Sequence, residues 1–149
     1  MTYVPVDKNM PEDRKENIAE QIKKEIGCAT PLMTQMTMKI KGRDLNSGLP
    51  RTDIITSDQV EQAMQESINK IVEVVKITLE KTPPELSADI SDRGIYMTGG
   101  GCLIDGLDRL LQEKTGINVM IAQDTVSCVA LGTGKALENL DALDGKGKR

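Results

Sequence analysis

The sequence contains no histidine, phenylalanine or tryptophan, and its only aromatic side chains are those of Tyr3 and Tyr96. Without histidine the chain cannot form a Ser-His-Asp or Cys-His catalytic arrangement, or a zinc site that includes histidine. The scarcity of aromatic rings removes the platforms on which single-stranded nucleic acids stack. A hydrophobic core must therefore come from aliphatic residues and the eight methionines.

Basic charge and long apolar runs are also missing. The net charge is −4, so the chain lacks the basic excess of a nucleic-acid-binding protein, and we expect no nucleic-acid partner. No apolar run reaches the roughly 18 residues of a membrane span, and the N-terminus lacks the apolar centre of a signal peptide. The three cysteines are widely spaced, which favours free thiols in a reducing compartment. These features predict a cytoplasmic protein.

The first half of the chain contains two helical patterns separated by two strands. Isoleucine recurs every four residues in 12–26, which predicts a helix that stops at Gly27. Residues 33–41 alternate apolar and polar side chains as in a half-buried strand, and 51–56 resume extended character after a loop. A long helix follows, capped by Thr56 with Gln59 and ended by Pro83-Pro84.

The last third reads as strand, glycine turn, helix, strand, helix. The strands are expected at 94–98 and 117–122 and the helices at 103–114 and 126–140. This order predicts an α/β layer with parallel strands. Residues 33–82, which precede this α/β layer, instead follow a ββα order. We therefore predict an α/β subdomain formed by residues 1–32 and 83–149, with a small ββα subdomain inserted at 33–82.

Three consecutive glycines, Gly99, Gly100 and Gly101, follow the strand at 94–98. Glycine permits positive φ and a close approach of another molecule to the backbone, and free N–H groups at the next helix start would suit an anion or polar ligand. The run is a candidate nucleotide cradle; the alternative is a tight connection without a ligand. Cys102, at the same helix start, is in a position that lowers a thiol pKa, but no base accompanies it.

Several segments match one protein family in continuous register from about residue 17 to 141. They include Gly94-Ile95-Tyr96-Met97-Thr98-Gly99-Gly100-Gly101 with Gly106-Leu107-Asp108-Arg109-Leu110, Ile18-Ala19-Glu20-Gln21-Ile22-Lys23-Lys24-Glu25-Ile26-Gly27, Lys41-Gly42-Arg43-Asp44-Leu45, Gly48-Leu49-Pro50, Lys81-Thr82-Pro83-Pro84-Glu85-Leu86 and Cys128-Val129-Ala130-Leu131-Gly132-Thr133-Gly134-Lys135-Ala136-Leu137-Glu138-Asn139. The chain thereby resembles the bacterial actin-like rod shape-determining proteins of the MreB/Mbl family.

The resemblance implies an actin/Hsp70-type (ribonuclease H-like) fold, ATP binding and self-assembly into filaments under the cytoplasmic membrane, with cell-shape and cell-wall synthesis proteins as partners. By position, Thr98 and Gly99 to Gly101 would approach the adenine and the α-phosphate side through backbone atoms. Glu20 would accept a hydrogen bond from a ribose hydroxyl, and Lys23, one turn along, would pack beside the base. No catalytic or metal-ligating residue is implied.

Family members are about twice this length, and the chain resembles their C-terminal half. Their two phosphate-binding loops and membrane-binding segments have no counterpart here, so membrane association and Mg²⁺ held through the phosphates belong to the full-length family. We therefore expect very weak ATP binding and no ATPase activity from these 149 residues, whether they are a truncated product, a partial gene or half of a split protein. Tight ATP binding by the chain alone would contradict this expectation.

Two other functions remain open from the sequence. The chain is alternatively a stand-alone adaptor domain that binds a filament or partner without nucleotide turnover. A small α/β enzyme that uses Cys102 or Cys128 is the third hypothesis, against which stand the missing histidines and the absence of paired catalytic carboxylates.

Overall fold

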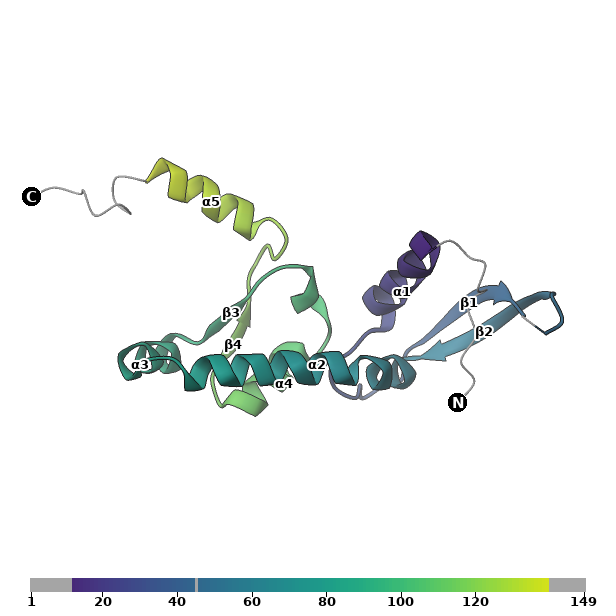
Figure 1. The fold of residues 1–149 in the computed structure, drawn as a ribbon, viewed down its shortest axis with the longest axis horizontal. Helices are drawn as coiled ribbons and strands as arrows, with labels where there is room; N and C mark the ends of the chain where they lie inside the picture. The colour runs from purple at the N-terminus through teal and green to yellow at the C-terminus, as the bar shows by residue number, and fades with distance from the viewer. Residues whose placement is uncertain (1–11, 45, 140–149) are drawn as a thin grey trace, which may run out of the picture. The chain divides into compact units, whose positions relative to one another are not determined.

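A computed structural model describes residues 12–44 and 46–139 of the chain (Figure 1). The outer ends of the predicted subdomain at 1–32 and 83–149, and the end of the helix predicted to reach residue 140, lie outside the described residues. In chain order the elements are α1 (Glu12–Ile26), β1 (Thr37–Arg43), β2 (Pro50–Thr56), α2 (Ser57–Glu80), α3 (Pro84–Arg93), β3 (Ile95–Met97), the 3₁₀ helix η1 (Gly100–Leu103), α4 (Leu107–Thr115), β4 (Val119–Ile121) and α5 (Cys128–Glu138).

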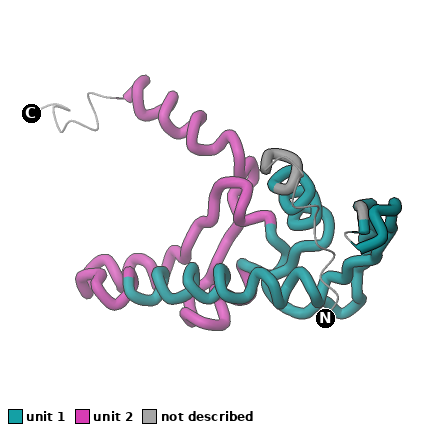
Figure 2. Tube along the Cα trace, turned by 45° about the vertical axis from the view of Figure 1, so that its right-hand side comes forward, with its two compact units in different colours: residues 1–77, 104–107 teal, residues 78–103, 108–149 magenta. Residues whose placement is uncertain are grey.

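The chain divides into two compact units, coloured teal and magenta in Figure 2. Unit 1 contains residues 1–77 and 104–107, and unit 2 contains residues 78–103 and 108–149. The division falls inside α2, between Ile77 and Thr78. The predicted subdomain boundaries at 32/33 and 82/83 stay a prediction.

In unit 1, β1 and β2 form an antiparallel hairpin, with Met38 opposite Ile55 on the partly buried face. Both strands were predicted, but β1 begins at Thr37 rather than at residue 33. The predicted capping box at the start of α2 is confirmed: Gln59 N donates to Thr56 Oγ1 at 3.3 Å, and Thr56 N donates to Gln59 Oε1 at 3.1 Å. These two bonds satisfy backbone donors that the helix cannot pair internally.

The core of unit 1 is aliphatic, as the composition predicted. Ile26, Cys28 and Ile68 are all buried, and Ile68 is only 1% exposed. Ala29 N donates to Asp105 O at 2.7 Å, and Cys28 forms a parallel bridge with Asp105. The segment 104–107 is thereby held by the chain that follows α1.

In unit 2, β3 and β4 pair in parallel, with Tyr96 opposite Met120, which confirms the predicted parallel strands. Gly94, which precedes β3, has φ +80°, and a Cβ there would lie 2.6 Å from Asn118 O. A larger residue would therefore clash with the backbone that leads into β4. The apolar pattern of the predicted helix places Leu103 in the core with Leu110 and Leu111. Leu110 and Leu111 on α4 are buried, whereas Leu103 lies in the segment before α4 and is 62% exposed.

The helix predicted at 103–114 is interrupted. A 3₁₀ helix occupies Gly100–Leu103, and α4 begins only at Leu107. Two features cause the break: Asp105 leaves the helical path to pair with Cys28 and Ala29, and Gly106 has φ +78°, outside the right-handed helical region. Within the described residues, no helix combines the length and apolar character of a membrane span.

Candidate functional site

The glycine turn is built at the end of β3. Thr98 is exposed, and Gly99 has φ +83°, the only positive φ among the three consecutive glycines. Gly99 N donates to Thr125 O at 2.6 Å, so this N–H group is not free for a ligand, contrary to the simplest expectation for the turn. The contact instead fixes the turn to the segment that precedes α5.

Gly100 and Gly101 are exposed and begin η1. A Cβ at either position would meet no atom of the protein within 4 Å. Neither residue has a positive φ, so the backbone conformation does not require glycine there. Steric contacts within the protein require glycine at position 94. They do not require it at positions 100 and 101, where the space beside the backbone is open.

Cys102 closes the turn from the inside. Its side chain is buried, and both its Sγ and its backbone N donate to Gly99 O, at 2.9 Å and 3.3 Å. The thiol therefore donates a hydrogen bond to the backbone of the turn. Cys128 is half-buried, and its Sγ donates to Thr125 O at 3.4 Å. The two thiols therefore bond to Gly99 and Thr125, the two residues that the Gly99 N–Thr125 O bond joins.

Glu20 and Lys23 come together on α1. Lys23 Nζ contacts Glu20 Oε2 directly, and Lys24 Nζ lies 3.5 Å from Glu20 Oε1. The hydrogen bond from Lys23, reinforced by the charges of both lysines and opposed by slight burial, holds the pKa of Glu20 below its ordinary range. The Glu20 side chain is 46% exposed. Glu20 is therefore an ionised acceptor that remains accessible to a hydroxyl donor.

The predicted site residues thus form two groups. Glu20 and Lys23 belong to unit 1, and Thr98 with the three glycines belongs to unit 2. The glycine turn follows β3 as predicted, but it leads into the 3₁₀ helix η1 and its Gly99 N–H group is bonded to Thr125 O. That both groups contact one nucleotide stays a prediction.

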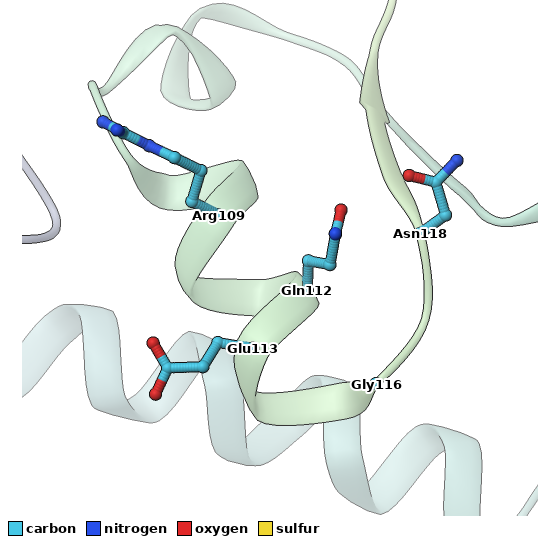
Figure 3. Close-up of a pocket in the computed structure, with 5 residues that line it drawn as sticks. All are labelled: Arg109, Gln112, Glu113, Gly116 and Asn118. Carbon is cyan, nitrogen blue, oxygen red and sulfur yellow. The ribbon is translucent and has the colours of Figure 1, made fainter.

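A second feature, which the sequence reasoning did not identify, is an open depression of about 560 Å³ in unit 2 (Figure 3). Arg109, Gln112 and Glu113 of α4 line it together with Gly116 and Asn118. Gln112 Oε1 accepts from Val119 N at 3.5 Å, and the Glu113 carboxylate points away from Asn118. None of the predicted site residues lines this depression. Its polar residues form the face of α4 opposite the leucines, which in sequence resembles any solvated helix face.

The family model described as MreB/Mbl protein matches residues 14–145. The chain is 48% identical over 128 residues to the cell shape-determining protein Mbl of Bacillus subtilis, covering 86% of this chain and 38% of Mbl. It is also 48% identical over 130 residues to the cell shape-determining protein MreB of Escherichia coli, covering 87% of this chain and 38% of MreB.

Solved structures agree. The crystal structure of MreB5 of Spiroplasma citri bound to ADP is similar with a TM-score of 0.79 and 34% identity, over 89% of this chain and 40% of that one. The same protein bound to AMPPNP gives a TM-score of 0.77 at the same identity and coverage. The 149 residues thus span well under half the length of these relatives, a smaller share than the half expected from the sequence. The chain belongs to the MreB/Mbl family of actin-like cell shape-determining proteins.

Proposed function

We propose that this chain supplies the adenosine-binding side of an actin-like nucleotide site, in a protein that binds ATP and assembles into membrane-associated filaments that direct rod cell shape and cell-wall synthesis. Family membership supports the actin-like part of this proposal. The ADP and AMPPNP in the similar MreB5 structures support an adenine nucleotide as the ligand. Filament formation, its partners at the cytoplasmic face of the membrane and ATP turnover are proposed for the whole protein.

The open side of Gly100 and Gly101 is the observation that carries the nucleotide proposal. A glycine in a helix destabilises it relative to alanine, and no atom of the chain occupies the space that a side chain would take. A ligand that lies against this backbone would need the space that a side chain at Gly100 or Gly101 would fill. No contact within the protein requires glycine at these two positions. Thr98 and the three glycines then border the adenine and the α-phosphate side, with Gly99 fixed by its bond to Thr125.

Glu20 and Lys23 supply the polar contacts of the proposed site. A carboxylate with a lowered pKa is ionised at neutral pH and accepts well from a ribose hydroxyl. Lys23 holds Glu20 in place and presents its aliphatic stem beside the base. Mg²⁺ enters the proposal only with the nucleotide phosphates, and none of these residues is proposed to hold it.

Titration of the isotopically labelled 149-residue chain with ADP, followed by the backbone amide resonances, tests this proposal. We expect weak, millimolar binding, because these residues contribute only one side of the site, with shifts at residues 99–101, 20 and 23. Adenosine is expected to shift the same resonances as ADP, because the contacts are to the base and ribose. Shifts confined to the Arg109 depression, or no shift at saturating nucleotide, would contradict the proposal.

A further inference from the structure

Cys102 holds the glycine turn from its buried side. The residue is 3% exposed, whereas the neighbouring Gly100 and Gly101 are exposed. Cys102 Sγ donates to Gly99 O at 2.9 Å, and the backbone N of Cys102 donates to the same oxygen at 3.3 Å. A carbonyl oxygen has two lone pairs, so these two donors can use both of them. The carbonyl group of Gly99 is therefore fully paired on the inner side of the turn.

The N–H group of Gly99 is fixed as well. It donates to Thr125 O at 2.6 Å, so three hydrogen bonds hold the two peptide groups on either side of Gly99. Gly100 and Gly101 have no side chain that could hold them, and glycine has more backbone freedom than any other residue. Their conformation therefore depends on how firmly Gly99 and Cys102 are held at the two ends of the segment.

We propose that Cys102 is a positioning residue of the nucleotide site. Its thiol, by donating to Gly99 O, keeps the turn in the conformation whose open side receives the nucleotide. This inference rests on the proposed function. The apparent affinity of a site falls with the fraction of molecules in the binding-competent conformation. One hydrogen bond changes such a conformational equilibrium by about twofold to tenfold, so loss of the thiol bond should weaken nucleotide binding by about threefold.

The other role open to a buried thiol is to fill space in the core, and Cys28 of unit 1 provides the comparison. Cys28 is 1% exposed, and its Sγ lies 3.8 Å from Ser57 O. The Sγ–O distance at Cys102 is 2.9 Å, and its acceptor belongs to a residue with φ +83° that begins a run of glycines. The shorter bond and the flexible segment that it closes favour positioning over space filling at Cys102.

Two substitutions of Cys102 separate positioning from packing. Cys102→Ala removes the thiol donor and keeps a small apolar side chain, whereas Cys102→Ser keeps a donor on a more polar group. Because the backbone N of residue 102 still pairs Gly99 O, both variants should fold. We expect Cys102→Ala to bind ADP about threefold more weakly and Cys102→Ser to bind it like the unchanged chain. In urea unfolding the alanine variant should be no less stable than the serine variant.

Cys28→Ala is the matched control. It removes another buried thiol that donates to a backbone carbonyl, but in unit 1 and away from the glycine turn. Its expected effect is a loss of stability with unchanged ADP affinity, measured by the same amide shifts. A loss of ADP affinity in Cys102→Ala that Cys102→Ser does not restore would assign the thiol to packing and overturn the inference.

A measurement without nucleotide separates this inference from the proposed function. Amide hydrogen exchange of residues 99 and 102 reports how often the turn opens. We expect their protection factors to fall by about threefold in Cys102→Ala and to stay unchanged in Cys102→Ser. Equal protection in all three chains, or equal ADP affinity of Cys102→Ala and the unchanged chain, would overturn the inference and leave the proposed function standing. Absence of ADP binding by the unchanged chain would overturn both.

Discussion

Replacing Gly100 by alanine tests whether glycine at this position is required for folding or for ligand binding. A methyl group at this position meets no protein atom within 4 Å, and the backbone has no positive φ that alanine would resist. Because alanine restricts the unfolded chain more than glycine does, Gly100→Ala should leave stability unchanged or raise it by about 0.4–1 kcal/mol. The same methyl group occupies the space proposed for the nucleotide. We expect at least tenfold weaker ADP binding, about 1.4 kcal/mol.

Two control variants isolate the cause. Gly132→Ala in α5 also meets open space without a positive φ, so it should match Gly100→Ala in stability but leave ADP binding unchanged. Gly99→Ala meets open space as well, but its φ of +83° should destabilise the fold by about 1 kcal/mol. Urea unfolding gives the stabilities, and the ADP-induced amide shifts give the affinities. If Gly100→Ala binds ADP like the unchanged chain, a ligand does not explain the glycine and the reasoning fails.

Three further predictions concern the scaffold. Thr56→Ala removes one side of the capping box and should lower the free energy of unfolding by about 1 kcal/mol in urea titrations; no loss would mean that water replaces the cap. Ile68→Ala should cost about 2–5 kcal/mol and Ile68→Val about 1 kcal/mol, and equal losses would exclude a tightly packed site. The backbone N–H groups of Ser47 and Asn46 hold the pKa of Asp44 below its ordinary range, so its stabilisation of the hairpin loop is present at neutral pH and lost as the pH falls through that lowered value; a carboxyl NMR titration with an ordinary pKa would contradict this.

Local sequence signals predicted the elements whose stability is local. The isoleucine repeat followed by Gly27 correctly predicted that α1 ends at Ile26. The Thr56–Gln59 pair predicted the start of α2 to within one residue. Both depend on contacts between residues three or four positions apart. The same spacing places Lys23 on the helix face of Glu20, as the sequence predicted, but the ion pair between them was not predicted.

Features that depend on distant partners were missed. The break before α4 arises because Asp105 pairs with residues far earlier in the chain, and periodicity carries no trace of that contact. The bond from Gly99 N to Thr125 O likewise joins segments about 25 residues apart, so a donor that seemed free is used internally. The Arg109 depression was missed because a polar helix face has the same pattern with or without a hollow beside it.

The bond from Ala29 N to Asp105 O also has a consequence for synthesis of the protein on the ribosome. The ribosome completes Asp105 more than seventy residues after Cys28 and Ala29, because all of α2, α3 and β3 lie between them. Unit 1 therefore cannot reach its final form until residues 104–107 have also been translated. Until Asp105 is made, the backbone of Cys28 and Ala29 lacks the partner that it has in the folded protein.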